Sequence, residues 1–301
     1  MNKTVSLGSA LLCTFIWGTT FIAQETGMQN IGPYVFNGVR FFVGFLALIP
    51  FYLLLEKKNT KKIISRNPKR FLFLSISIGI FLFLASVFQQ VALLYTDVAN
   101  AAFFTIFYVP MVPIIVFFLF KKSIHWSVWP SVLLCLMGGY LLTNFHDATV
   151  RLGDSLVIIC AVFWSLHIIF ISKIIEEFDA PILIGLIQTI IVSVLSIILA
   201  SLYEDFIIED ILSQKFEILY AGILSGGIAF VLQIYAQKNI SAAPAAIIFS
   251  LEGVFATIAA WILLNQILDI NNILGCSFIL AGVLFSQLIP EFKKLKINNI
   301  K

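Results

Sequence analysis

Ten long apolar runs dominate this sequence, and each is about as long as a helix that crosses a bilayer. Crossing the hydrocarbon core takes about 20 apolar residues in a helix, and only helices or closed barrels satisfy their backbone groups there. The sequence therefore predicts an all-α integral membrane protein with ten transmembrane helices, at residues 5–23, 33–55, 71–95, 98–120, 126–145, 154–171, 180–202, 216–235, 241–264 and 270–289.

Composition supports a membrane protein over a soluble one. Of the 301 residues, 60% are hydrophobic and 12% are charged, about half the charged fraction of an ordinary soluble domain. The connectors are short and leave no room for a soluble domain. The run at 5–23 lacks a small-x-small cleavage site, so we expect it to be retained as a span and not removed as a signal peptide.

The charge of the connectors reverses between the two halves of the chain. The connector at 56–70 holds seven bases, whereas its counterpart at 203–217 holds five acids and the single base Lys215. Because basic loops stay in the cytoplasm, these equivalent loops should lie on opposite faces of one bilayer. The bases are Lys57, Lys58, Lys61, Lys62, Arg66, Lys69 and Arg70, and the acids are Glu204, Asp205, Glu209, Asp210 and Glu217.

The full charge distribution predicts an orientation. With a cytoplasmic N-terminus, sixteen of the nineteen Lys and Arg residues fall on the inner side. Arg151 and Lys215 fall on the outer side, and Arg40 lies within a span. We therefore expect a multi-pass protein of the bacterial inner membrane with both termini in the cytoplasm.

The ten spans divide into two repeats of five, which we place at 1–145 and 152–290, followed by a basic cytoplasmic tail at 291–301. An odd number of spans per repeat forces the second copy to insert upside down. Several residues match in the same order in both halves. At a constant offset, Gln89, Ala92, Ala99, Ala101 and Ala102 match Gln233, Ala236, Ala243, Ala245 and Ala246.

Inverted repeats allow two mirror-like packings, with a substrate held where the halves meet near the midplane. Small residues let membrane helices approach closely, and Gly222, Gly226 and the alanines at 242–246 suit that role. A static packing role is equally compatible. We expect Pro110 and Pro113 to bend the fourth span, because proline removes an internal hydrogen bond.

Four short motifs resemble those of the EamA family within the drug/metabolite transporter superfamily. They are Trp17-Gly18-Thr19-Thr20-Phe21, Arg40-Phe41, Ala99-Asn100-Ala101-Ala102-Phe103 with Phe107-Tyr108-Val109, and Ser250-Leu251-Glu252-Gly253-Val254-Phe255. In the last motif, Gly253 stands where the family usually has the proline expected to kink the helix. The resemblance implies a ten-helix inverted-repeat carrier of small metabolites, often an exporter.

Few polar residues remain inside the spans, and these are the candidates for a substrate cavity. Arg40 and Glu252 lie deep, where an ionisable group costs several kcal/mol unless it is paired or faces water. Uncharged polar groups around them suit a zwitterionic or amphipathic substrate. The expected cavity residues are Trp17, Arg40, Gln89, Asn100, Tyr108, Trp164, His167, Gln188, Gln233 and Glu252.

Two roles remain open for Glu252. A structural ion pair with Arg40 is the favoured interpretation, and proton coupling during transport is the alternative. His167 could relay protons because an unperturbed imidazole titrates near neutrality, or it could simply hydrogen-bond to a neighbouring helix.

The sequence favours a secondary transporter that moves an amino acid, an amine or a similar amphipathic compound by alternating access. No nucleotide-binding, HExxH or GxSxG pattern occurs, so we expect no enzyme activity, no cofactor, no metal site and no nucleic-acid partner. A non-transporting scaffold or a channel is the alternative. The oligomeric state stays open.

Overall fold

The computed structural model describes residues 2–96, 98–143, 151–263 and 267–298, and their regular structure is helical. The first half contains α1 (Lys3–Thr26), α2 (Pro33–Phe51), the π-helix η1 (Tyr52–Glu56), α3 (Lys57–Ile64), α4 (Pro68–Ala92), α5 (Val98–Thr105), α6 (Tyr108–Phe120) and α7 (Val128–Leu142). The second half contains α8 (Leu152–Glu177), α9 (Pro181–Tyr203), α10 (Ile208–Ser213), α11 (Lys215–Leu219), the π-helix η2 (Tyr220–Ala229), α12 (Phe230–Gln237), α13 (Ala242–Phe249), α14 (Leu251–Leu263) and α15 (Ile270–Asn298).

The ten-helix prediction is confirmed. Nine helical stretches of the described residues are long and apolar enough to cross a membrane. The tenth is α7, an apolar helix of 15 residues that ends at Leu142. The last two residues of the span predicted there, 144–145, lie outside the described residues.

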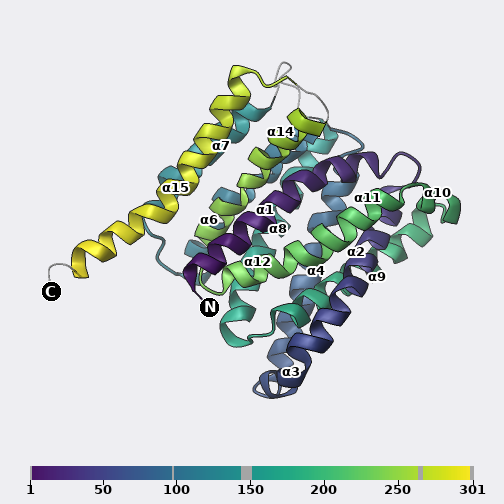
Figure 1. The fold of residues 1–301 in the computed structure, drawn as a ribbon, viewed down its shortest axis with the longest axis horizontal. Helices are drawn as coiled ribbons and strands as arrows, with labels where there is room; N and C mark the ends of the chain where they lie inside the picture. Colours follow the sequence, from purple (N-terminus) through teal and green to yellow (C-terminus); the bar gives the residue numbers. More distant parts are fainter. Residues whose placement is uncertain (1, 97, 144–150, 264–266, 299–301) are drawn as a thin grey trace.

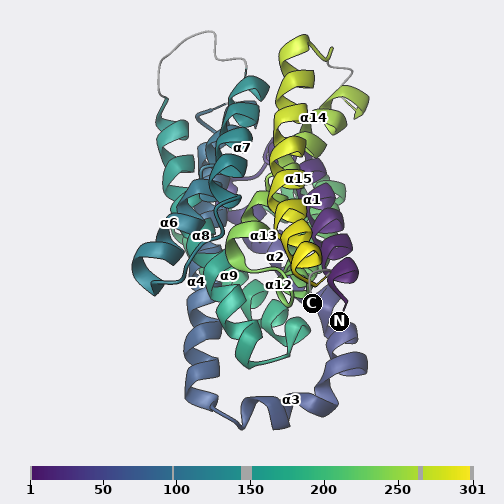
Figure 2. The same ribbon diagram turned by 90° about the vertical axis from the view of Figure 1, so that its left-hand side faces the viewer.

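Both charged connectors contain short helices that the sequence patterns did not predict. Within the basic connector, α3 carries four exposed lysines while Thr60 on its other side is buried. Figure 2 shows α3 lying across the end of the bundle, between the helices that it joins. The acidic connector contains α10 near the opposite end (Figure 1).

The fourth and ninth spans are each broken near the middle, at equivalent positions. Pro110 has no N–H to donate to the carbonyl of Ile106, which instead accepts from Val109 at 2.8 Å. In the ninth span the carbonyl of Ser250 accepts from Gly253 at 3.2 Å, between α13 and α14. The bend expected from proline is therefore present with Gly253 in its place.

The two halves interlock and share one interior. Helices from different halves pack as pairs, including α4 with α8, α2 with α9, α1 with α14 and α7 with α15 (Figure 1). Small residues permit this approach, as predicted for Gly222: a Cβ at that position would lie 2.7 Å from the backbone carbonyl of Arg40.

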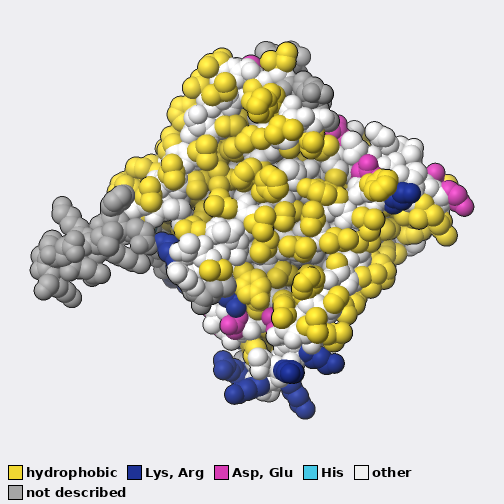
Figure 3. All heavy atoms as spheres, viewed as in Figure 1, with side chains coloured by type: hydrophobic (Ala, Val, Ile, Leu, Met, Phe, Trp, Pro, Cys, Tyr) yellow, Lys and Arg dark blue, Asp and Glu magenta, His cyan; other side chains and the backbone are white. Residues whose placement is uncertain are grey.

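Charge marks the two ends of the bundle. In Figure 3, apolar side chains cover most of the visible face, Lys and Arg gather near α3, and Asp and Glu gather near α10 and α11. We call the end that carries α3 the basic face and the end that carries α10 the acidic face. The middle of the bundle between them is apolar on the outside, as the bilayer interior requires.

Candidate functional site

A cavity lies between the two halves and encloses about 540 Å³ of atom-free space, counting the part open to solvent. Most of its lining residues are repeat equivalents, 144 or 147 positions apart. These pairs are Trp17 with Trp164, Phe21 with Ile168, Ser86 with Phe230, Gln89 with Gln233, Thr105 with Phe249, and Tyr108 with Glu252; the remaining lining residues are Gln24, Arg40, Phe41 and Ser225.

Aromatic rings form one wall of the cavity. The ring centroids of Trp17 and Trp164 are 5.9 Å apart, and Phe230 stacks on Trp164 at 5.9 Å. Phe249 contacts Trp17 edge-on at 5.6 Å. Both indole N–H groups are buried and donate to no acceptor among the described residues. The wall therefore offers apolar surface together with two unused hydrogen-bond donors.

Arg40 is a nearly fully buried cation whose hydrogen-bond partner is neutral. Its repeat equivalent does not line the cavity. Its Nε and Nη2 donate to Asn37 Oδ1 at 3.2 and 2.8 Å, while Nη1 donates to no acceptor in the described part of the chain. The guanidinium carbon lies 4.9 Å from the ring centroid of Phe41. No acidic side chain of the described residues pairs with this charge, and an unpaired charge is costly inside a membrane protein.

The Asn37 side chain makes four hydrogen bonds, two with Arg40 and two with serines on neighbouring helices. Its Nδ2 donates to Ser86 Oγ at 3.1 Å and to Ser196 Oγ at 2.9 Å, so it connects α2 to both α4 and α9. Both amide atoms are used and the side chain is 0% exposed. This geometry fixes which guanidinium nitrogen remains available to the cavity.

Glu252 is the acidic side chain that lines the cavity. Its Oε1 accepts a hydrogen bond from the Tyr108 hydroxyl at 3.2 Å, across 144 sequence positions. The two residues are repeat equivalents, so this bond joins the halves at their meeting point. Oε2 accepts no hydrogen bond from the described residues.

The favoured Arg40–Glu252 ion pair is wrong for this conformation. Neither residue forms an ion pair with any described residue. Arg40 lies two turns from the start of α2, whereas Glu252 follows the break between α13 and α14. Sequence depth placed both near mid-membrane but could not show that they lie on helices with different neighbours.

Seven of the ten expected residues line the cavity, and three do not. Gln89 donates to Thr105 at 3.1 Å, and both amide atoms of Gln233 are buried without a partner. His167 bonds to Gln188 at 2.9 Å and packs edge-on against Trp164 and Phe230. This bond lies outside the cavity lining, and it leaves His167 Nδ1 and Gln188 Nε2 buried without a partner among the described residues. Asn100 is half-buried on α5, more than a turn before Thr105.

Two structural carboxylates were missed by the sequence analysis. Glu56 accepts from the backbone N–H groups of Ile182 and Leu183 at the start of α9, at 3.1 and 2.7 Å. Glu204 accepts from Tyr34 and Val35 at the start of α2, at 2.9 and 2.7 Å. The two glutamates are repeat equivalents, 148 positions apart, and that spacing was the available signal.

The EamA-like transporter family model matches the chain twice, over residues 5–144 and 151–288. In the described residues, no group of three or more His, Cys, Asp or Glu side chains could hold a metal ion.

Individual relatives cover most of the chain. It is 31% identical over 290 residues to an uncharacterized transporter of Archaeoglobus fulgidus, covering 94% of this chain and 85% of that protein. It is 27% identical over 210 residues to a probable amino-acid metabolite efflux pump of Escherichia coli, covering 65% of this chain and 63% of the pump. A solved crystal structure superposes with a TM-score of 0.79 at 17% identity, over 96% of this chain and 98% of that one, which shows a shared fold.

Proposed function

The chain belongs to the EamA-like transporter family, and on that basis we propose that it is a secondary transporter that exports a small zwitterionic metabolite by alternating access. We place it in the bacterial inner membrane with the basic face and both termini in the cytoplasm, because basic connectors stay inside. It is a multi-pass membrane transporter in any orientation.

One observation carries the substrate assignment: the cavity walls hold a basic and an acidic side chain that form no ion pair with each other. Arg40 bonds only to a neutral amide, and Glu252 bonds only to a neutral phenol. A buried charge without a counter-ion is costly, and a molecule carrying both a carboxylate and an ammonium group would offset both. An α-amino acid or a close derivative has that chemistry.

The aromatic wall favours an apolar group on the same molecule. Trp17, Trp164 and Phe230 present ring surface beside the unused indole donors. The amino-acid metabolite pump of Escherichia coli is consistent with this class. Glu252 also remains a candidate proton carrier, since a carboxylate in a cavity that changes sides could load and release a proton.

Counterflow in proteoliposomes tests the proposal against the alternatives of a channel and a non-transporting scaffold. Vesicles preloaded with each of the twenty protein amino acids in turn should accumulate the same labelled amino acid transiently when it is a substrate. Arg40→Gln should abolish accumulation, while Arg40→Lys should retain part of it because the charge remains. A channel gives flux without counterflow, and a scaffold gives neither.

A further inference from the structure

The cavity extends further toward the acidic face than toward the basic face. Some residues line the cavity although their equivalents in the other repeat do not. They include Gln24, near the end of α1, and Arg40 and Phe41, near the start of α2. Their equivalents in the second repeat are Ile171, Gln188 and Thr189, which lie toward the basic face and are 0% exposed. In this conformation the cavity therefore lies nearer to the acidic face.

A separate groove indents the basic face. It encloses about 830 Å³ of atom-free space, counting the part open to solvent. Apolar side chains such as Phe120 and Ile169 line it together with the charged groups of Lys122, Lys173 and Glu176. The Lys173 amine lies 3.4 Å from the ring centroid of Phe120 and forms no hydrogen bond or ion pair with a described residue.

The groove and the cavity share three helices. On α8, Ile168 lines the cavity and the next residue, Ile169, lines the groove. On α6, Tyr108 and Val116 line the two spaces, about 12 Å apart at 1.5 Å of rise per residue. On α13, Phe249 lines the cavity and Ala243 lines the groove.

Small and aliphatic side chains separate the two spaces. Val109, Val112, Ala245 and Ala246, which we call the plug, are each 0% exposed and belong to one apolar cluster. Their side chains have no polar groups, so only van der Waals packing joins α6 and α13 here. Small residues at a helix interface allow helices to approach and slide, so the plug can part without breaking a hydrogen bond.

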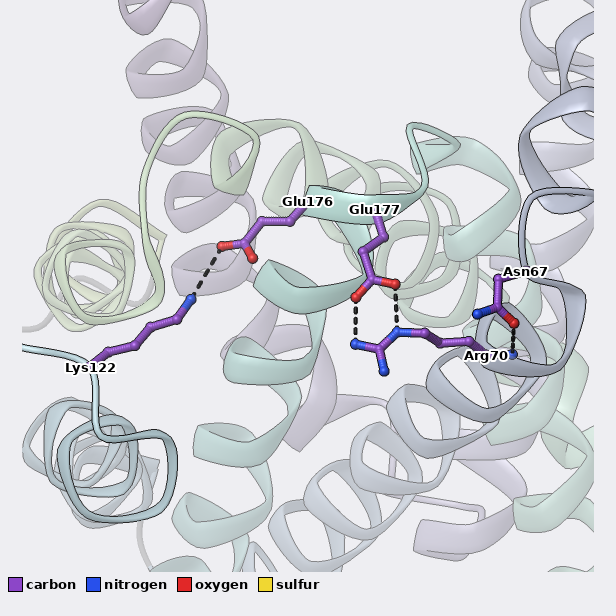
Figure 4. A network of polar contacts seen from close by, with 5 residues as sticks. All are labelled: Asn67, Arg70, Lys122, Glu176 and Glu177. Carbon is purple, nitrogen blue, oxygen red and sulfur yellow. Dashed lines mark hydrogen bonds and ion pairs between the residues drawn. The ribbon is translucent and has the colours of Figure 1, made fainter.

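One weak contact ties the helices at the mouth of the groove. Lys122, just after α6, lies 3.6 Å from Glu176 near the end of α8, with side chains 63% and 62% exposed. The neighbouring Glu177 forms an ion pair with Arg70 at 2.5 Å. The two glutamates therefore connect the end of α8 to the start of α4 and to the segment just after α6 (Figure 4). An exposed pair such as Lys122–Glu176 contributes about 0–1 kcal/mol.

We infer that the groove is a second substrate site on the same path, at the vestibule of the basic face. It receives the carboxylate of the metabolite at Lys173 and Lys122, and it joins the cavity when the plug parts. This inference rests on the proposed transport function. Exchanging the conformations of the two halves would extend the cavity along α8 toward Ile171 and so toward the basic face.

Cysteine accessibility in oriented membrane vesicles tests the path. We would place single cysteines in the groove (Ala243→Cys), in the plug (Val112→Cys and, separately, Ala245→Cys) and in the cavity (Ser225→Cys). Ser65→Cys, exposed on the basic connector, is the control for sidedness, and the parent chain measures labelling of its native cysteines. Each variant is treated from either side with a charged, membrane-impermeant thiosulfonate and, in parallel, with a lipid-soluble maleimide.

The charged reagent should modify the groove and both plug cysteines from the basic face only, with the plug slower because it must part first. The cavity cysteine should react faster from the acidic face. The path would be overturned if the plug cysteines reacted from the acidic face. It would also be overturned if they stayed unmodified after the groove cysteine had reacted completely. A groove cysteine that reacts only with the maleimide would identify a lipid-filled cleft.

Protection tests the binding step. A mixture of the twenty protein amino acids should slow charged labelling of Ala243→Cys about twofold where the bound fraction is half, and Lys173→Gln should remove that protection. Absence of protection in the unaltered background would overturn binding in the groove. Cysteine labelling does not require transport. If the expected labelling and protection are observed but counterflow is absent, the result contradicts the proposed function and not the second site.

Discussion

At the scale of single residues, the cavity is organised by one buried cation and the amide that orients it. Asn37 accepts two hydrogen bonds from Arg40 and donates two to serines on neighbouring helices. Because all four bonds are made in the interior, the amide cannot rotate without leaving a polar group unsatisfied, at about 1–3 kcal/mol. Asn37 is therefore a positioning residue for Arg40.

Asn37→Ala should raise the KM for a transported amino acid about tenfold, since a guanidinium that is no longer held loses roughly one charged hydrogen bond. Ser196→Ala is the matched control, because it removes one bond from Asn37 but leaves the contact with Arg40. The measurement is counterflow with the amino acid and with the amine that lacks its carboxylate. Equal losses for both compounds would indicate a merely structural role.

Glu252→Gln should separate proton coupling from substrate binding. If Glu252 carries the proton, the variant keeps substrate exchange but loses the component driven by an imposed pH gradient. The test is counterflow and gradient-driven uptake in the same proteoliposomes. Tyr108→Phe is the control, since it removes the hydrogen bond to Glu252 at 3.2 Å but not the carboxylate. Retained gradient-driven uptake in Glu252→Gln would exclude this residue as the proton carrier.

Sequence reasoning found the residues that polarity within a span makes conspicuous, such as Arg40, Trp17 and Glu252. It placed His167 and Gln188 in the cavity, whereas these two residues bond to each other outside its lining. Depth in a span does not reveal such pairing. Sequence reasoning also missed lining residues that look ordinary. Phe230 and its repeat equivalent Ser86 both line the cavity, and neither stands out from its neighbours in the sequence.

At the scale of helices, α2 and α9 form a reciprocally capped pair. The acid at the end of each binds the free N–H groups at the start of the other, one at each face. The first N–H groups of a helix have no partner within it, and a carboxylate there is favoured by the helix dipole. Since both ends are capped alike, we expect this pair to stay fixed while α6, α8 and α13 move.

Glu56→Gln and Glu204→Gln should destabilise the protein by similar amounts, about 1.5–3 kcal/mol each, because each removes hydrogen bonds to a charged acceptor. Thermal unfolding in detergent measures the effect. Glu209→Gln is the control, an exposed acid on the same connector as Glu204, and it should leave the melting temperature unchanged. A large loss for one variant and none for the other would contradict the equivalence of the two caps.

Gly18→Leu should impair folding, because a Cβ at Gly18 would lie 2.6 Å from the backbone oxygen of Glu252 and 2.8 Å from the nitrogen of Ala256. Forcing atoms into so close a contact costs about 1–3 kcal/mol. Gly8→Leu on the same helix is the control, since nothing lies within 4 Å of a Cβ there. Comparable yields of folded protein for the two variants would show that α1 and α14 do not need this approach.

Helix number and approximate bounds followed from apolar length, which the bilayer fixes. Helix interruptions were harder to predict. Pro110 indicated the break in the fourth span. The equivalent break in the ninth span, at Ser250, involves no proline and could be predicted only from the repeat. The short helix α3 was hidden because lysines suggested only a charged connector. Its position across the end of the bundle (Figure 2) depends on contacts that no local pattern contains.

At the scale of the whole molecule, the inverted repeat and the asymmetric cavity are what the proposed alternating-access mechanism requires of one of its two states. The twelve paired lining residues define what both states share, and Gln24, Arg40 and Phe41 define what this state adds near the acidic face. The basic connector and the acidic connector occupy equivalent places on opposite ends of the bundle (Figure 3). Under the proposed mechanism, orientation in the membrane therefore decides which of the two states loads the substrate.

The last prediction concerns that orientation. Asn59→Cys, on exposed α3 among the lysines, should react with an impermeant thiol reagent only from the cytoplasm. Glu209→Cys, on α10, should react only from outside. Lys and Arg in short loops resist translocation and set the orientation, and the connector at 56–70 carries seven of them. Labelling of intact and permeabilised cells measures both sites. External labelling of Asn59→Cys would show that the basic face lies outside the cell. The acidic face, nearer to the cavity in this conformation, would then lie in the cytoplasm.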